Sequence, residues 1–168
     1  MMPKRPDRFA MRCTVFALAS ALAVPGALAQ TIKQAAQSKI TKSAPEAKHK
    51  LAIQVNQNDK AVMDLALNNA KNVIDFYKAK GETVAIEIVA YGPGLHMLRA
   101  DTSPVKERIA PMSLENPGLA FIACGNTQAN QAKAEGKPVS LISEAKVMPS
   151  GVVRLMELQK QGYAYIRP

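Results

Sequence analysis

The residue best suited to chemistry in this sequence is Cys124, which ends the apolar run in "FIACGNT", residues 121–127. A thiol at the end of a buried strand, just before a helix, lies beside unpaired amides and the positive end of the helix dipole. Both stabilise the thiolate, the nucleophilic form of cysteine. We expect Asn126 or Thr127 to cap that helix, and Gly125 to leave the approach to the sulfur open. The segment therefore indicates a nucleophilic or sulfur-carrying thiol.

A simpler interpretation of Cys124 stays open beside this one. Free cysteine is among the most often buried residue types, and it often only fills space in a core. The second cysteine, Cys13, lies in the N-terminal apolar segment, and no basic side chain adjoins Cys124 in the sequence. The sequence alone therefore does not choose between a reactive thiol and a structural one.

The two histidines and the glycine-rich turns are weaker candidates. His96 follows "YGPG", which contains Gly92 and Gly94, and it is either a base near Cys124 or a surface residue. His49 lies among lysines, and we expect it to be solvated. Cys124 and the two histidines do not have the spacing of zinc ligands, so we expect no metal site. We also expect no cofactor. "YGPG" and "CGNT" match neither a Walker loop nor GxGxxG; they shape a small anion or sulfur pocket, or merely turn the chain.

The first 29 residues have the pattern of a secretory signal peptide. Basic residues between Lys4 and Arg12 precede an apolar stretch from Cys13 to Val24, and Ala27-Leu28-Ala29 is a small-x-small cleavage pattern. The apolar stretch is shorter than the roughly 20 residues of a membrane span. We therefore expect cleavage after Ala29, a periplasmic location and a mature chain without a transmembrane segment.

Charge is concentrated in the segment that follows. The chain has 22 basic and 13 acidic residues, and loss of residues 1–29 removes four and one of them, which leaves a net charge of +6. Residues 30–50 hold five lysines and one glutamate, a net charge of +4, so residues 51–168 carry only +2. We interpret residues 30–49 as a disordered polar leader and residues 50–168 as one domain. Nucleic-acid binding needs a basic face on the domain, and we do not expect it.

Apolar runs and turn residues predict alternating strands and helices. Strands are expected at 50–56, 83–92, 118–125, 145–148 and 163–168, and helical segments at about 60–80, 95–100, 105–110, 126–136 and 150–162. Strands that alternate with helices predict an α/β fold, with a parallel sheet covered on both faces.

Three motifs in order, "YGPG", "ACGNT" and "VMPSGVVRLMELQKQGYAYIRP", resemble the DsrE/DsrF-like family, specifically its small stand-alone branch. The resemblance covers Lys50 to Pro168. It implies a flavodoxin-like, three-layer α/β/α sandwich with a mostly parallel five-stranded sheet, assembled as a homotrimer or homohexamer. In sulfur-relay members of this family a cysteine carries sulfur as a persulfide and passes it to a partner protein's cysteine.

Carried over residue by residue, the resemblance assigns the sulfur-carrying position to Cys124, followed by Gly125, Asn126 and Thr127. Pro149, Ser150 and Gly151 match a second motif, which is expected to form a pocket. The best understood relay members are cytoplasmic, whereas this chain has an export pattern.

The first hypothesis is thus an exported carrier that exchanges sulfane sulfur with a donor or acceptor protein, with enzymatic activity left open. The alternative is a non-catalytic ligand-binding or assembly module in which Cys124 is buried. A redox-sensing thiol that pairs between subunits is a third hypothesis.

Overall fold

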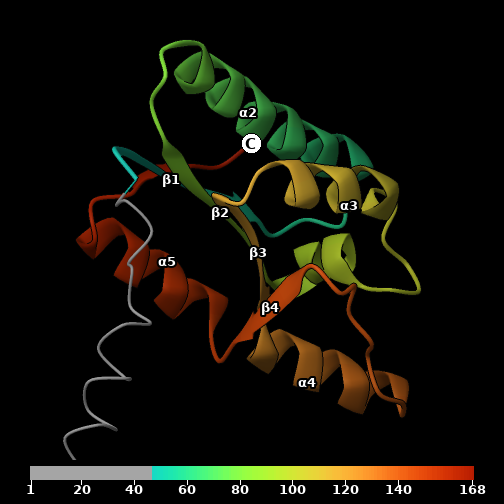
Figure 1. The fold of residues 1–168 in the computed structure, drawn as a ribbon. Coiled ribbons are helices and arrows are strands. Elements are labelled where there is room, and N and C mark those ends of the chain that lie inside the picture. The colour runs from blue at the N-terminus through green and yellow to red at the C-terminus, as the bar shows by residue number, and fades with distance from the viewer. Residues whose placement is uncertain (1–46) are drawn as a thin grey trace, which may run out of the picture. The chain divides into compact units, whose positions relative to one another are not determined.

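Five strands alternate with helices in residues 47–168, the part of the chain that the computed structural model describes (Figure 1). The predicted signal peptide and residues 30–46 of the predicted leader lie outside the described residues. The strands are β1 (His49–Val55), β2 (Val84–Ala90), β3 (Leu119–Cys124), β4 (Ala145–Met148) and β5 (Ala164–Ile166). The helices are α2 (Lys60–Ala79), the 3₁₀ helix η1 (Gly92–Leu98), α3 (Lys106–Glu115), α4 (Gly125–Glu135) and α5 (Gly151–Lys160).

The strands form one sheet in the order β4-β3-β2-β1-β5, and every neighbouring pair is parallel. Its register places Ile53 beside Ile88 and Ile88 beside Phe121, so large apolar side chains form one continuous layer. The predicted α/β fold with a parallel sheet is confirmed. Because the strands are parallel, their carboxyl ends, Cys124 among them, all lie at the same edge of the sheet.

Helices cover both faces of the sheet and give it three layers. On one face the core joins the strands to α2, η1 and α3 through Met63, Leu67, Leu95 and Ile109, among others. On the other face Ala52, Val89 and Ile122 pack against Leu155 and Leu158 of α5. Helix α2 forms because its buried residues recur at helical spacing, and because the Asp59 side chain caps it by accepting from the Ala61 amide at 2.7 Å.

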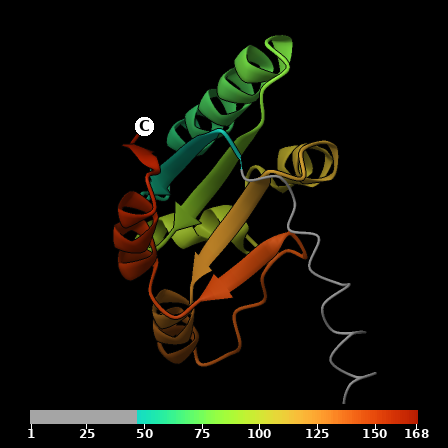
Figure 2. The same cartoon turned by 60° about the vertical axis from the view of Figure 1, so that its left-hand side comes forward.

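Helix α4 is placed differently from the other helices. The arrowheads of β3 and β4 point toward it in Figure 2, so it lies at the carboxyl edge of the sheet. None of its residues is buried. Its place is therefore determined by polar contacts and by its attachment to the end of β3, and less by apolar packing.

The structure departs from the predicted boundaries at two places that have a physical explanation. Strand β1 begins at His49, which is only partly exposed and not fully solvated as expected: its ring stacks on Tyr77 with centroids 3.6 Å apart, and Nε2 lies 2.7 Å from Glu82 Oε2. Helix α3 continues through Pro111 to Glu115, beyond the predicted end at 110. Proline removes one amide donor, and packing of Ile109 and Met112 on the core keeps the helix intact.

Within residues 47–168, no helix combines the length and the hydropathy that crossing a bilayer requires.

Candidate functional site

Cys124 is the last residue of β3 and also the N-cap of α4, with the extended backbone angles typical of a cap (φ −74°, ψ 113°). We predicted the cap at Asn126 or Thr127, but the helix already begins at Gly125. Asn126 and Thr127 are therefore the second and third helical residues, whose amides have no partner within the helix. A sulfur atom thus occupies the place where serine, threonine or aspartate usually supplies an oxygen.

The thiol is buried and yet surrounded by hydrogen-bond donors. Cys124 is 5% exposed. Burial raises the pKa of its thiol, but the Thr127 hydroxyl and the amides of Gly151, Thr127 and Asn126 outweigh this effect, so the pKa is lowered from 9.0. The sulfur accepts no capping hydrogen bond of full geometry. These donors therefore act on it mainly as electrostatic contacts, and together they favour the thiolate.

The Thr127 hydroxyl is oriented by the turn that follows β2. The Gly92 amide donates to Thr127 Oγ1 at 2.9 Å. Because the oxygen accepts this bond, the hydroxyl proton is free to be donated to the sulfur. Gly92 has φ +53°, a conformation that glycine adopts without strain. The predicted binding residue Gly92 thus acts on the thiol through Thr127.

The predicted second motif lies beside the thiol. A Cβ atom on Gly151 would lie 3.1 Å from Tyr91 Cβ and 3.3 Å from Cys124 Cβ, so a larger residue would press on both, and glycine lets the first amide of α5 approach the sulfur without such crowding. Ser150 Oγ caps α5 by accepting from the Val153 amide at 3.4 Å. The Pro149 carbonyl accepts from the Asn126 amide at 3.1 Å. This motif thereby joins the beginnings of α4 and α5 around Cys124.

Two predicted glycines have a packing role in the structure. A Cβ atom on Gly125 would lie 3.3 Å from the Met148 carbonyl oxygen and 3.3 Å from Val147 Cγ1. Gly125 therefore lets α4 start close to the end of β4, which differs from the open approach that we expected. A Cβ atom on Gly94 would lie 2.3 Å from the Val55 carbonyl oxygen, so this glycine lets η1 pass over the end of β1.

His96 lies in the wall of a cavity next to the thiol. The cavity has a volume of about 470 Å³ between η1 and α4 and is lined by Asn58, Gly92, Pro93, His96, Thr127, Asn130, Gln131 and Ala134. Thr127 belongs both to this wall and to the surroundings of the sulfur, whereas Cys124 does not line the cavity. His96 Nδ1 lies 2.8 Å from Thr102 Oγ1. The structure thus pairs His96 with a hydroxyl and not with the thiol.

Tyr91 is a neighbour of the thiol to which the sequence analysis assigned no role. Burial raises the pKa of its phenol, and negative charge at Tyr165 and Cys124 raises it further, against the effects of Arg167 and Asn56. The only sequence signal was an aromatic residue directly before "GPG", at the end of β2. With Tyr91, the surroundings of the sulfur include residues that follow β2, β3 and β4.

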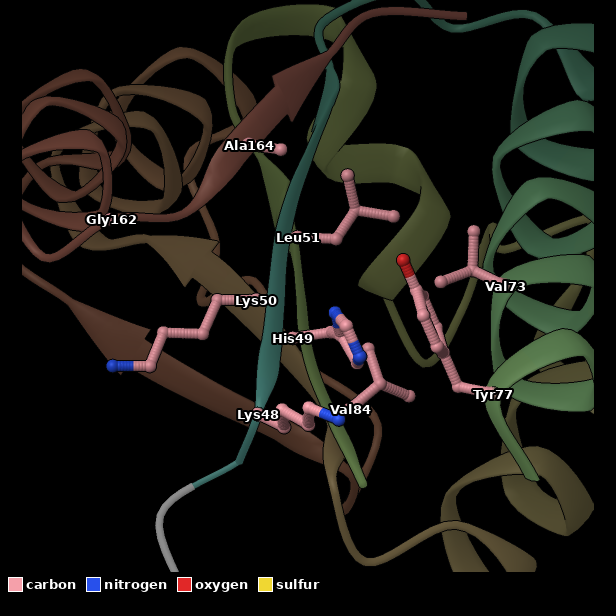
Figure 3. Close-up of a pocket in the computed structure, with 9 residues that line it drawn as sticks. All are labelled: Lys48, His49, Lys50, Leu51, Val73, Tyr77, Val84, Gly162 and Ala164. Carbon is pink, nitrogen blue, oxygen red and sulfur yellow. The ribbon is translucent and has the colours of Figure 1, made fainter. Parts of the chain in front are cut away.

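A second cavity lies at the opposite edge of the sheet, where the parallel strands begin (Figure 3). It has a volume of about 370 Å³ and is lined by Lys48, His49, Lys50, Leu51, Val73, Tyr77, Val84, Gly162 and Ala164. In Figure 3 the His49 ring lies against the Tyr77 ring, and the Tyr77 hydroxyl points toward Leu51. This cavity is separate from the thiol site. In the part of the chain that the structure describes, no group of three or more His, Cys, Asp or Glu side chains could hold a metal ion.

Arg99 connects α4 to the segment after η1. Its side chain is 2% exposed. Nε and Nη2 donate to the two Asp101 carboxylate oxygens at 2.9 and 2.7 Å, and Nη1 and Nη2 donate to Glu135 of α4, the latter at 3.0 Å. Nη1 also donates to Gln131 Oε1 at 3.2 Å. The last two turns of α4 are thus bound to a buried guanidinium.

This network predicts a loss of stability in acid. The Arg99 hydrogen bonds lower the pKa of Asp101 from 3.8 to about 2 and lower that of Glu135 from 4.5. Because both folded values lie below the unfolded ones, the carboxylates stabilise the fold above pH 4.5 and lose this contribution as the pH falls toward about 2. Thermal unfolding followed by circular dichroism should show the melting temperature falling over this range. Asp101→Asn should show a smaller fall, and an equal fall would contradict the assignment.

Comparison with known proteins identifies a relative but no function. No family model and no curated protein matches the chain. A solved structure, that of the protein of unknown function MTH1491 from Methanobacterium thermoautotrophicum, matches with a TM-score of 0.60 and 30% sequence identity. The match covers 72% of this chain and 100% of that one. This chain therefore belongs to the same family of α/β proteins as MTH1491.

Proposed function

We propose that this protein is an exported DsrE/DsrF-like sulfur carrier, in which Cys124 accepts and donates sulfane sulfur as a persulfide. The observation that carries the proposal is the cap of α4: a buried thiol whose pKa is lowered by a hydroxyl and by amides from two helix starts. Thiolate is the form of cysteine that attacks sulfur, so these donors favour the reactive state. A thiol that only filled space would gain nothing from them.

The transfer is chemically balanced without an external oxidant or reductant. The Cys124 thiolate attacks the outer sulfur of a persulfide or polysulfide, the donor's S–S bond breaks, and the donor leaves as a thiolate. In the second step the acceptor's thiolate attacks the outer sulfur on Cys124, and the Cys124 thiolate leaves. A low thiol pKa makes Cys124 a good leaving group in this second step. The donors around the sulfur therefore assist both steps.

Export and assembly complete the proposal. The signal-peptide pattern of residues 1–29 supports a periplasmic location, and in the proposal a partner protein there supplies or receives the sulfur. We propose a homotrimer or homohexamer. Support comes from four apolar side chains on β4 and α5 that are about half exposed: Val147, Val152, Val153 and Met156. Size-exclusion chromatography with light scattering should show the assembly, and a clean monomer would remove it from the proposal.

Sulfur loading tests the carrier role directly. The protein is prepared in a Cys13→Ser background, so that Cys124 is its sole thiol, and incubated with polysulfide or with thiosulfate and a sulfurtransferase. Intact mass spectrometry should show the mass of one added sulfur atom, which a reductant removes and which Cys124→Ser abolishes. Circular dichroism checks that the serine variant is folded. Absence of the added mass, or its persistence in the serine variant, would reject the carrier role.

The burial of Cys124 favours a second candidate, a non-catalytic binding module. The thiol is 5% exposed, and the 470 Å³ cavity beside it is lined by polar and small apolar residues, with no lysine, arginine, aspartate or glutamate among them, and not by Cys124. In such a module the cavity holds a small ligand and the cysteine is structural. Thiol labelling separates the two candidates. Slow labelling of the native protein with fast labelling in denaturant supports the module, and fast native labelling supports the carrier.

A further inference from the structure

Arg99 is a buried cation whose backbone is held by hydrogen bonding to the segment that contains Ser140 and Leu141. It forms an isolated antiparallel bridge with Leu141, and the next amide, that of Ala100, donates to the Ser140 carbonyl at 3.0 Å. A buried charge is costly unless it is paired. Arg99 is paired twice, with Asp101 in its own segment and with Glu135 in the last turn of α4. The guanidinium is therefore a rigid point to which α4 is attached.

Helix α4 depends on this attachment because it has no buried side chain. Further hydrogen bonds link α4 to the chain that follows it: Gln128 Nε2 donates to the Val139 carbonyl at 2.8 Å, and the Asn126 amide donates to the Pro149 carbonyl at 3.1 Å. Polar contacts at both ends of α4 thus hold the helix in place, and those of Gln131 and Glu135 with Arg99 hold its last turns. The same helix carries Asn126 and Thr127 at its start, where their donors face the sulfur.

A chain of hydrogen bonds also runs from Arg99 to the thiol. Arg99 donates to Gln131 Oε1, and Gln131 Nε2 donates to the Gly92 carbonyl at 3.3 Å. A guanidinium only donates, so the Gln131 oxygen must face Arg99 and its amide nitrogen must face Gly92. The Gly92 amide then donates to Thr127, whose hydroxyl faces the Cys124 sulfur. Every link in this chain has a defined direction.

We propose that Arg99 is a positioning residue for the Cys124 thiol, acting through α4 and through Gln131, Gly92 and Thr127. It does not touch the sulfur. By binding Glu135 and Gln131 it keeps α4 and the Gly92 turn together, so that the donors stay directed at the thiol. The inference rests on the proposed function in one respect: both concern the Cys124 thiol. Its test measures the pH dependence of the alkylation of that thiol, without any sulfur donor.

The direction of the effect separates positioning from simple electrostatics. The charged groups around Arg99 are Asp101, Glu135 and Lys137. The titratable group beside the sulfur is Tyr91, whose own pKa is affected by Tyr165 and Arg167. Removing the negative charge of Glu135 acts through space to lower the thiol pKa, because less negative charge opposes the thiolate. Loss of the donors' alignment raises the thiol pKa instead. The two mechanisms predict opposite shifts.

The experiment is the pH profile of iodoacetamide alkylation of Cys124 in the full chain with Cys13→Ser. Glu135→Gln should raise the midpoint by on the order of half a pKa unit, which leaves about threefold less thiolate at pH 7. Asp101→Asn is the matched control, since it removes a carboxylate from the same guanidinium but not from α4. Its midpoint should equal that of the parent chain or lie slightly below it.

Gln131→Met is a second variant that breaks the chain without changing charge, and it should raise the midpoint in the same direction. It decides the question if circular dichroism shows that Glu135→Gln is unfolded. Midpoints of the folded variants at or below that of the parent chain would overturn the proposal, as would an equal rise in Asp101→Asn. Failure of sulfur loading alongside the expected midpoint shifts would count against the carrier role alone.

Discussion

Replacing Thr127 by valine is expected to raise the pKa of the Cys124 thiol by about one unit, since a hydrogen bond to a charged group contributes roughly 1.5–3 kcal/mol. Valine has nearly the shape of threonine, so the helix start is kept and the hydroxyl donor is lost. The substitution also leaves the Gly92 amide without the acceptor that it has at 2.9 Å. The amides of Gly151 and Asn126 remain, which limits the shift.

The alkylation rate at neutral pH should fall less than the thiolate fraction. A rise of about one unit lowers that fraction about tenfold, but the less acidic thiolate is roughly threefold more nucleophilic, so the net loss is about threefold. The pH profile of iodoacetamide alkylation separates the two effects. Thr127→Ser keeps the hydroxyl and should retain the parent midpoint. An unchanged midpoint in Thr127→Val would show that this hydroxyl does not stabilise the thiolate.

Gly94→Ala is expected to destabilise the fold by about 3 kcal/mol, at the upper end of the usual cost of overpacking. The new Cβ atom would lie 2.3 Å from the Val55 carbonyl oxygen and 2.6 Å from its carbon, and neither is a flexible side-chain atom. That carbonyl also accepts the Tyr91 amide at 3.1 Å. Moving this carbonyl therefore disturbs the connection from β2 to η1, which holds Gly92 in place for its hydrogen bond to Thr127.

Gly81→Ala is the matched control for this prediction. Gly81 has φ +68° with open space around its Cβ position, so alanine there incurs only the strain of a left-handed conformation, about 1 kcal/mol. Urea unfolding of the two variants should show the larger loss at Gly94. Equal free energies of unfolding would mean that η1 moves away from β1 at little cost.

Local patterns in the sequence predicted the elements of this fold well. Strand β3 is a continuous apolar run because it is buried on both faces, and its predicted range of 118–125 contains the observed Leu119–Cys124. The start of α5, predicted at 150 and observed at Gly151, was also predicted well, since the Ser150 cap acts on a neighbour in sequence. The end of α3 was not predicted, because Pro111 is a local signal while packing of Ile109 and Met112 on the core is not.

The candidate site was predicted only in part. The strand end and the helix start predicted the place of Cys124, and the family resemblance pointed to Pro149, Ser150 and Gly151. The hydrogen bond from Gly92 to Thr127 joins residues 35 apart, and those from Arg99 to Gln131 and Glu135 join residues 32 and 36 apart. No spacing rule links such positions, so the contacts of Arg99 and the place of Tyr91 beside the thiol became visible only in the structure.

The sequence by itself determined that the chain forms an α/β domain with a cysteine at the end of a buried strand, because burial patterns and caps are local properties. How far that thiol is stabilised as a thiolate, against the effect of its burial, depends on the tertiary structure alone. Its pKa depends on the balance between burial and the donors that α4 and α5 bring to one point. That balance is a property of distances between elements, and these exist only once the sheet has brought the elements together.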